Sequence, residues 1–425
     1  MRKIKHLRWW IAGLLFLATV INYLSRQTLS VLQPVIQKEF GLTNTDYSHI
    51  VFAFMLAYMF MQAGSGRIMD RLGTRLGMAL AIVWWSAASM LHATAGSAAL
   101  FAVWRFMLGA GEAGNWPGSV KAISEWFPVK ERAMATGLFN SGSCIGALVA
   151  PPMVVWIAVR WEWRAAFVVT GLLGFVWLIL WLWLYRLPEK HPRITPEELE
   201  HIRSGRYNAA DPSAEGATPA RWRDLFKDRN ALALVFARMF ADPVWWFFVF
   251  WLPAYFKSAR DFSLEMIGLL VWIPFLTADL GNFVGGGASS YLVKRGVPAV
   301  RARKIVMFAS AAAMVASIPA AFTASATTAL VLISLATLAY SSWATNVLTL
   351  PMDVIRHDAV GSATGLAGTG GGLGGMAFTL LTGRIVDLVS YTPIFIMAGI
   401  MPLIAASIIV VGIKDRSAGN VPRTV

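Results

Sequence analysis

The stretch "GRIMDRLGTR", residues 66–75, separates two long apolar runs and combines two glycines with three arginines and one aspartate. Basic residues between apolar runs keep a connection on the cytoplasmic side of a membrane, but an aspartate adds nothing to that bias. The first glycine lets two helices approach closely. We therefore expect Asp70, Arg71 and Arg75 to form a charge latch at this connection; the alternative is a plain topology-determining loop.

The composition indicates that the solvent around most of the chain is lipid. Of the 425 residues, 57% are hydrophobic and only 14% are charged, and the mean hydropathy is +0.58. These values are too apolar for a soluble protein of this length. The net charge of +14 could indicate nucleic acid, but the basic residues lie at the ends of apolar segments, where they meet anionic lipid. We expect a lipid bilayer and no nucleic acid as partner.

Apolar runs of about 20 residues, the length of a membrane-spanning helix, occur twelve times. This count predicts an all-α polytopic membrane protein with twelve transmembrane helices in two six-helix repeats. The predicted spans lie near residues 9–37, 46–69, 76–95, 98–126, 132–159, 164–186, 230–256, 263–293, 304–323, 326–350, 360–387 and 392–413.

A polar, proline-punctuated stretch in the middle divides the chain. We expect a six-helix bundle at 1–187, a cytoplasmic linker at 188–229 and a second six-helix bundle with a short cytoplasmic tail at 230–425. In the linker, "TPEELEHI" predicts a short surface helix that starts with a threonine cap and a proline. The halves also echo each other, because "ATGLFNSGSCIG" at 135 and "ATGLAGTGGGLG" at 363 share four residues and two later glycines. Such parallel repeats bind substrate at mid-depth between them.

The distribution of lysine and arginine predicts the orientation. The N-terminus, the connection after the second span, the linker, the stretch 294–304 and the tail are basic, which places both termini in the cytoplasm. Arg160, Arg164, Lys257 and Arg260 are exceptions. The first 24 residues resemble a signal peptide, but no small-residue cleavage site follows, so we read an uncleaved first span. A single cysteine, Cys144, excludes an internal disulfide.

Gly66, Asp70, Arg71, Gly73 and Arg75 match the signature of the major facilitator superfamily, and the twelve-span pattern extends this resemblance along nearly the whole chain. The stretches "MRKIKHLRW", "INYLSRQTLSV", "FLTADLGNFVGGGAS" and "EAGNWPGSVKAISEWFPVKERAMATGLFNSGSCIGALVAPPMVVW" further resemble the bacterial hexuronate transporters of the anion:cation symporter family. That family moves organic anions, often sugar acids, together with protons. The resemblance implies a multi-pass protein of the bacterial inner membrane, which we expect to be monomeric.

The resemblance also implies which residues form the site. It implies that two arginines meet the substrate carboxylate and that Glu112 carries protons. Several sugar-acid members have an aspartate before the first-helix arginine, where this chain has Ser25. This difference puts coupling through two acids in doubt. The substrate-binding residues implied in the first half are Tyr23, Arg26, Tyr58, Arg105, Asn140 and Ser143.

Physical reasoning about Arg105 and Glu112 reaches a related hypothesis. A charge at mid-bilayer costs about 2.5–3.5 kcal/mol, so each needs a partner, a cavity or a function. Seven residues apart, the two side chains lie on one helix face, and Glu112 leans back toward Arg105. Burial favours the neutral form of a carboxyl group and a nearby arginine favours its charged form, so such a group can exchange a proton near neutral pH. The alternative is a buried structural pair. For Arg26, the planar guanidinium suits bidentate binding of a carboxylate at any pH.

The second half offers weaker candidates. Arg238 and Asp242 are four apart, the spacing of a helical ion pair, and Asp242 is a second candidate for proton coupling or a structural residue. Trp343 and Asn346 are candidates for substrate binding, and Trp245 is a further cavity candidate. Two polar residues of the eighth span, Asp279 and Asn282, are expected to tie that helix to its neighbours.

Other classes of function lack their motifs. The sequence has no Walker-type nucleotide loop, no recognisable hydrolase triad and no histidines at metal-ligand spacing, so we expect no enzyme, catalytic residue, metal or cofactor. The leading hypothesis is secondary active uptake of a small organic anion, a hexuronate such as galacturonate or glucuronate, with protons. The alternatives are a carrier of another organic anion (aldonate or aldarate), an anion exchanger, and a sugar-acid receptor that does not transport.

Overall fold

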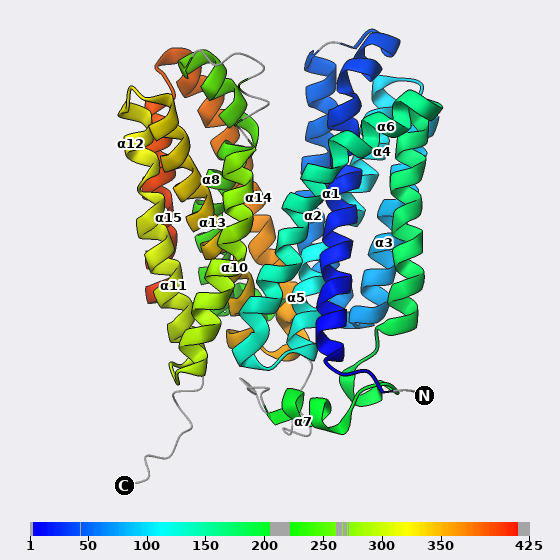
Figure 1. Cartoon of the computed structure of the whole chain (residues 1–425), viewed down its shortest axis with the longest axis vertical. Coiled ribbons are helices and arrows are strands. Elements are labelled where there is room, and N and C mark those ends of the chain that lie inside the picture. The colour runs from blue at the N-terminus through cyan, green and yellow to red at the C-terminus, as the bar shows by residue number, and fades with distance from the viewer. Residues whose placement is uncertain are drawn as a thin grey trace. The chain divides into compact units, whose positions relative to one another are not determined.

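A computed structural model describes residues 3–42, 44–204, 222–260, 266, 270 and 272–414. Within these ranges the chain is helical, with short 3-10 turns and one isolated bridge between Ile4 and Ile194. The helices are labelled in Figure 1 where space permits, and their bounds are α1 (Leu7–Phe40), α2 (Asn44–Leu72), α3 (Thr74–Leu91), α4 (Ala98–Glu112), α5 (Asn115–Trp126), α6 (Val129–Leu184), α7 (Pro196–Ser204), α8 (Arg229–Arg260), α10 (Ile273–Lys294), α11 (Ala299–Met314), α12 (Ser317–Phe322), α13 (Ala326–Val354), α14 (Val360–Leu388) and α15 (Thr392–Gly412).

Each of the twelve predicted spans coincides with described helix, which confirms the all-α polytopic fold. Helices α4 and α5 share the fourth span, and α11 and α12 share the ninth. Helix α6 holds the fifth and sixth spans, separated by the non-helical residues Trp161 and Glu162. Most of 263–272, the start of the predicted eighth span, lies outside the described residues. By length and hydropathy alone, eight helices in the described ranges could cross a membrane.

The chain packs into two compact units that do not follow chain order. The first unit contains residues 1–128, 138–204 and 358–365, and the second contains 129–137, 205–357 and 366–425. The first turns of α6 therefore pack with the second unit, and the start of α14 packs with the first. The expected division of the chain into 1–187, 188–229 and 230–425 is not tested by these units and stays a prediction. Residues 205–221 of the expected linker lie outside the described residues.

Glycines of the repeated sequence motif explain this exchange. In each repeat the two later glycines lie so close to a neighbouring backbone carbonyl that an added Cβ would be 2.0–2.7 Å from its oxygen. These pairs are Gly142 with Phe16, Gly146 with Val20, Gly370 with Val235 and Gly374 with Met239. The first glycine of each motif instead meets a helix of the other repeat: Gly137 meets the carbonyl of Asn282, and Gly365 meets that of Gln62. Both repeats thus use the same packing pattern.

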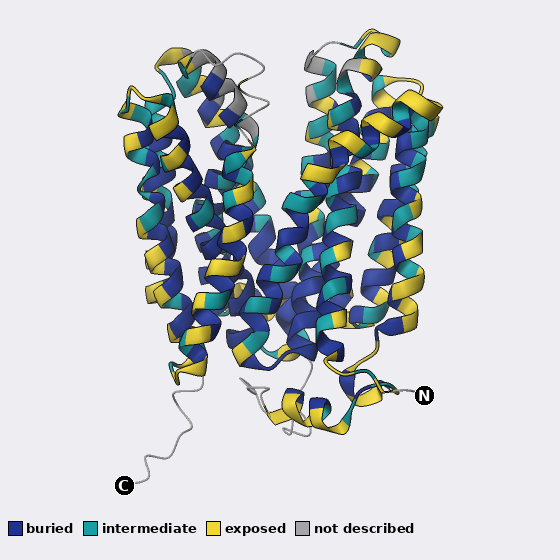
Figure 2. Ribbon diagram, in the orientation of Figure 1, coloured by how far each residue is buried: buried dark blue, intermediate teal, exposed yellow. Residues whose placement is uncertain are grey.

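Burial follows the helix faces within each unit (Figure 2). Sides that face neighbouring helices are buried, as in the aromatic cluster around Phe247 and Phe395. Large apolar side chains remain exposed on other sides, including Ile179 at 70% and Leu380 at 77%. Exposed apolar surface on this scale suits contact with lipid.

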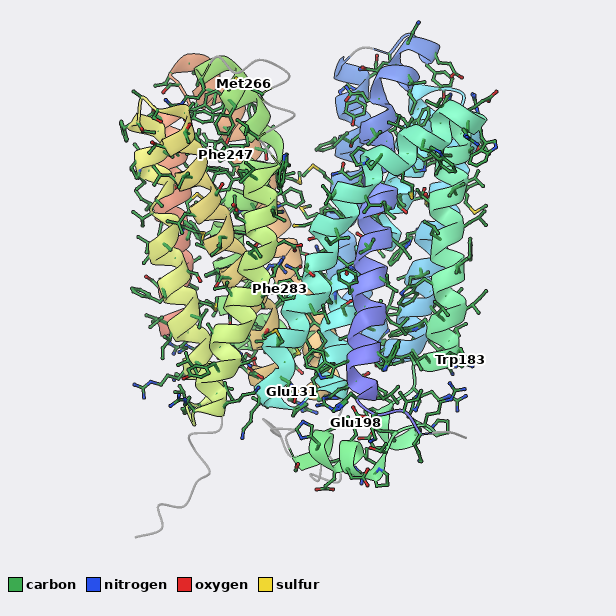
Figure 3. All side chains as sticks on the ribbon, in the orientation of Figure 1. Glu131, Trp183, Glu198, Phe247, Met266 and Phe283 are labelled. Atoms are coloured by element: carbon green, nitrogen blue, oxygen red, sulfur yellow. The ribbon has the colours of Figure 1, made fainter. Side chains whose placement is uncertain are left out.

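The predicted linker helix forms as α7 and is joined to the start of α1. Thr195 caps α7 by accepting a hydrogen bond from the Glu198 amide at 3.2 Å. The buried carboxylate of Glu198, labelled in Figure 3, in turn accepts hydrogen bonds from the amides of Leu7 at 2.8 Å and Arg8 at 3.1 Å. It also forms an ion pair with the Arg8 guanidinium at 2.9 Å. The linker thus caps the first helix, whose own sequence supplies no acidic residue there.

Candidate functional site

The central feature of the first unit is an ion pair between α1 and α4. The Nε of Arg26 donates to Oε2 of Glu112 at 3.1 Å, and Nη2 of Arg26 lies 3.1 Å from the same oxygen. The Glu112 side chain is fully buried. The sequence suggested Arg105 as the charge that attracts Glu112, but the structure pairs Glu112 with Arg26, because α1 brings that guanidinium to the end of α4. Sequence spacing on one helix could not reveal a partner from another.

Arg105 lies beside this pair and keeps donors available. Its Nη2 donates to the backbone oxygen of Arg26 at 2.6 Å, which fixes α4 to α1. In the described part of the chain, its buried Nε and Nη1 have no hydrogen-bond partner. The phenyl ring of Phe54 lies under both guanidinium groups, 5.0 Å from Cζ of Arg26 and 5.1 Å from Cζ of Arg105. Two arginines thus meet near one carboxylate.

Aromatic rings enclose Arg26. Its Cζ lies 4.8 Å from the ring centre of Tyr23 and 4.9 Å from that of Tyr58. Tyr58 also stacks on Phe54, with ring centres 5.6 Å apart. The structure therefore brings together Tyr23, Tyr58 and Arg26, three of the predicted site residues, in cation–π geometry.

Asn140 and Ser143 of α6 reach the same region through a tryptophan. The indole Nε1 of Trp116 donates to Oδ1 of Asn140 at 3.2 Å, and the Trp116 ring meets the Tyr23 ring edge-on at 6.2 Å. The Ser143 hydroxyl donates to the Asn140 backbone oxygen at 2.8 Å, so its donor is used within its own helix. Sequence reasoning missed Trp116, which lies in the first turn of α5, four residues after Glu112.

In the second unit, the predicted pair of Arg238 and Asp242 is confirmed. Nε of Arg238 lies 2.9 Å from Oδ2 of Asp242, one helical turn away. The Tyr340 hydroxyl donates to the other carboxylate oxygen at 3.4 Å, and the Trp245 ring stacks on Tyr340 at 5.3 Å. An added Cβ at Gly371 would lie 2.0 Å from Asp242 Oδ2, so this glycine makes room for the carboxylate. Tyr340 carried no signal in the sequence.

The other candidates of the second unit lie in packing between α10 and α13. Trp343 and Asn346 are fully buried, and the Asn346 amide donates to the backbone oxygens of Gly285 at 3.1 Å and Ser342 at 2.9 Å. The expected tie from the eighth span is confirmed, since Thr345 donates to the Asn282 side chain at 3.0 Å. The Asn282 amide also lies 3.4 Å from Asp279. The described contacts of Asn346 are therefore those of a helix-packing residue.

Asp70 lies at the N-terminus of α14. Its Oδ1 accepts from Lys121 Nζ at 2.6 Å and from the Gly361 amide at 3.2 Å, and its Oδ2 accepts from the Ser362 amide at 2.7 Å. Amides at a helix start lack partners in the helix, and a carboxylate there is favoured by the helix dipole. The partner of Asp70 is Lys121, which the sequence analysis did not single out.

The two arginines of the predicted latch lie elsewhere. Arg75 donates to the Leu182 backbone oxygen at 2.5 Å, so it joins the start of α3 to the end of α6. Arg71 is exposed. Within the second unit, a comparable charge cluster joins Asp353 to Arg132 at 3.0 Å and to Arg303 at 3.3 Å. Sequence reasoning missed this cluster, because its members come from three different helices.

Comparison with known proteins places these features in a family. The model of the Major Facilitator Superfamily matches residues 15–379. A hexuronate transporter of Escherichia coli (strain K12) is 34% identical over 419 residues, which cover 98% of this chain and 96% of that protein. A probable L-galactonate transporter of the same strain is 36% identical over 315 residues, 73% of this chain and 68% of that protein.

A solved structure of the proton:xylose symporter XylE has the same fold, with a TM-score of 0.73 over 94% of each chain and 14% sequence identity. The shared fold and the matched family model agree. The chain therefore belongs to the Major Facilitator Superfamily, a family of membrane transporters and not of enzymes.

Proposed function

We propose that this transporter takes up a sugar acid, a hexuronate such as galacturonate or glucuronate, together with protons by alternating access. The observation that carries the proposal is the fully buried Glu112 paired with Arg26, next to the unpartnered donors of Arg105. The similarity to a hexuronate transporter over nearly the full length supports the substrate class.

Charge balance explains how such a site would couple the two movements. Arg26, Arg105 and an ionised Glu112 together carry one net positive charge, and the Glu112 carboxylate competes with a substrate carboxylate for Arg26. Protonation of Glu112 removes its negative charge and releases Arg26 to bind the substrate carboxylate. When proton and substrate leave on the inside, the Arg26–Glu112 pair reforms. Binding of the anion and of the proton thus favour each other, because the anion offsets the second positive charge that protonation of Glu112 leaves on the two arginines.

The remaining site residues have proposed roles that follow from their chemistry. Tyr23, Tyr58, Asn140 and Ser143 offer hydroxyl or amide groups for sugar hydroxyls around the arginines. In the second unit, Asp242 with Arg238 is a candidate for a second titrating pair, whereas Trp343 and Asn346 are proposed to act through helix packing.

Opening and closing on the cytoplasmic side is proposed to depend on Asp70. Its bonds to the Gly361 and Ser362 amides hold the start of α14 against α2 and α5. Lys121 neutralises the carboxylate, while Arg75 fixes α3 to α6. We propose that both termini and the linker lie in the cytoplasm of a bacterium, in keeping with the basic connections, and that the chain works as a monomer.

The test is uptake of a panel of labelled sugar acids into proteoliposomes, with and without an imposed pH gradient. The proposal expects accumulation of galacturonate or glucuronate that depends on the gradient, with no competition from galactose. Preference for an aldonate would favour the second candidate, which the similarity to a probable L-galactonate transporter supports. Exchange of sugar acid at a rate that does not depend on the pH gradient would indicate an exchanger. Binding of sugar acid without transport would indicate a receptor.

A further inference from the structure

Two rows of polar side chains face each other between α1 and the α4–α5 segment. On α1 the row consists of Asn22 and Thr19, three residues apart, and on α4–α5 it consists of Glu112, Asn115 and Ser119, at spacings of three and four. Such spacings keep Asn22 with Thr19, and Asn115 with Ser119, on one helix face each, and Glu112 precedes α5 across the turn at 113–114. The Asn115 amide donates to the Thr19 hydroxyl at 3.0 Å, which shows that the faces meet. We call these five residues the polar seam.

The polar seam contains buried polar atoms that lack protein partners. All five side chains have no solvent exposure. Within the described residues, four atoms of the seam have no hydrogen-bond partner: Asn22 Nδ2, Glu112 Oε1, Asn115 Oδ1 and Ser119 Oγ. Buried polar groups in native proteins are hydrogen-bonded, and where protein offers no partner the partner is ordered water. Three of these atoms, on Glu112, Asn115 and Ser119, follow one another along the α4–α5 segment.

Both rows of the polar seam extend from Glu112 toward the same end of the unit. From Glu112, residue numbers rise along α5 and fall along α1, and both helices end where Trp9 meets Phe127 edge-on, with ring centres 5.1 Å apart. The seam therefore extends from the buried carboxyl group toward the end of the unit at which α1 starts. In the proposed orientation this is the cytoplasmic end.

We propose that the polar seam holds a file of ordered water and that this file carries the proton away from Glu112, with Asn115 and Ser119 as its hydrogen-bonding positions. The proposal rests on the proposed function of Glu112 as proton carrier. In the step, the O–H bond of protonated Glu112 breaks and its proton joins the adjacent water. Each water in the file then accepts one proton and donates another. Glu112 is left ionised and pairs again with Arg26.

The groups around Glu112 favour this direction of transfer. Arg26 from α1 and Arg105 from α4 face the carboxyl group and repel a proton on their side, and Tyr23 and Tyr58 enclose Arg26. Oε2 of Glu112 is bound to Arg26, whereas Oε1 has no partner in the described part of the protein. The unpartnered oxygen is therefore the one available to water in the seam.

The experiment compares two rates in proteoliposomes, using galacturonate as the probe. Exchange of labelled for unlabelled galacturonate lets the carrier return loaded, so Glu112 keeps its proton. Net uptake, followed by a trapped pH-sensitive dye, requires release of the proton in every cycle. We expect Asn115→Leu, which is nearly isosteric, to lower galacturonate-driven proton uptake about tenfold more than exchange, a barrier change of about 1.4 kcal/mol. Ser119→Ala should lower the ratio of galacturonate-driven proton uptake to galacturonate exchange by a smaller factor.

Matched variants separate this role from a structural one. Ser89→Ala removes another buried serine of the first unit, one that is hydrogen-bonded to Thr170 at 3.2 Å and lies outside the seam, and should leave the ratio of the two rates unchanged. Asn115→Thr restores a hydrogen-bonding group and should recover the ratio in part. The solvent deuterium isotope effect on net uptake should change in Asn115→Leu and not in Ser89→Ala.

Two results would overturn the inference, and they differ from each other. Equal loss of exchange and net uptake in Asn115→Leu, or no loss of either, would assign Asn115 to packing alone and leave proton coupling at Glu112 untouched. Galacturonate exchange without any galacturonate-driven proton uptake in the unmodified protein would overturn the proposed symport, and the role of the seam with it.

Discussion

Glu112→Gln removes the titrating group of the buried site while changing its shape very little. Glutamine keeps an oxygen that can accept the Arg26 Nε hydrogen bond, now 3.1 Å long, but it carries no charge and takes up no proton. The variant therefore resembles the protonated state in which Arg26 is free to bind the substrate carboxylate. We expect it to bind galacturonate and to exchange it, but not to accumulate it.

The size of the effect follows from the single carboxylate at the Arg26–Arg105 site. One proton with one sugar-acid monoanion carries no net charge, so the membrane potential does not act on the loaded carrier and the pH gradient alone drives it. One pH unit corresponds to about 1.4 kcal/mol, or about a tenfold concentration ratio. The unmodified protein should thus accumulate galacturonate about tenfold per pH unit, and Glu112→Gln about onefold.

The assay is the steady-state ratio of labelled galacturonate in proteoliposomes at several imposed pH gradients. Glu125→Gln is the matched control, because Glu125 is another buried carboxylate of the first unit but is bound to the hydroxyls of Thr74 and Tyr185. It should keep the unmodified ratio. Full accumulation by Glu112→Gln would refute the reasoning and move proton coupling to Asp242. A ratio well above tenfold per pH unit in the unmodified protein would require a second titrating group.

Three further predictions concern recognition, gating and pH. Arg26→Lys and Arg105→Lys should each weaken galacturonate uptake by about 10- to 100-fold. Lysine lacks the planar guanidinium, and loss of a charge-assisted hydrogen bond costs about 1.5–3 kcal/mol. Unchanged affinity in both variants would exclude carboxylate binding at these arginines. Asp70→Asn should lower the maximal rate with little change in affinity, because it weakens the bonds to Lys121 and the α14 amides; unchanged flux would reduce the motif to a topology signal. Burial lowers the pKa of His191, whose Nε2 lies 2.9 Å from the Leu184 carbonyl, so stability should be complete above about pH 6.5 and fall as the pH decreases. The melting temperature of the unmodified protein should therefore drop more between pH 7.5 and 5.5 than that of His191→Gln, and parallel curves would contradict this.

Local sequence patterns predicted most of the fold. Apolar run lengths located the twelve spans, and the threonine–proline start located α7, because both signals are contained within one segment. The pair of Arg238 and Asp242 was likewise predictable, since its four-residue spacing lies on one helix. Family resemblance added Tyr23, Arg26 and Tyr58, which the structure brings together around one guanidinium.

Contacts between distant segments could not be predicted in the same way. Nothing in the spacing of α4 indicates that Glu112 meets Arg26 of α1, or that Asp70 meets Lys121 of α5. These partners are set by which helix faces touch, and that depends on close approaches such as Gly109 against the Phe54 carbonyl, where an added Cβ would lie 2.4 Å from the oxygen. The same limit applies to Tyr340, which reaches Asp242 from α13.

The exchange of segments between the two units has a consequence for biosynthesis. The first unit needs residues 358–365 to satisfy Asp70 and to pack against Gly66, whose added Cβ would lie 2.2 Å from the Gly361 oxygen. At about 5–20 residues per second, these residues leave the ribosome tens of seconds after residue 128. The first bundle must therefore wait in the membrane with Asp70 and Lys121 paired only to each other or to water. A translation arrest before residue 358 should leave it open to proteases and chaperones at this end.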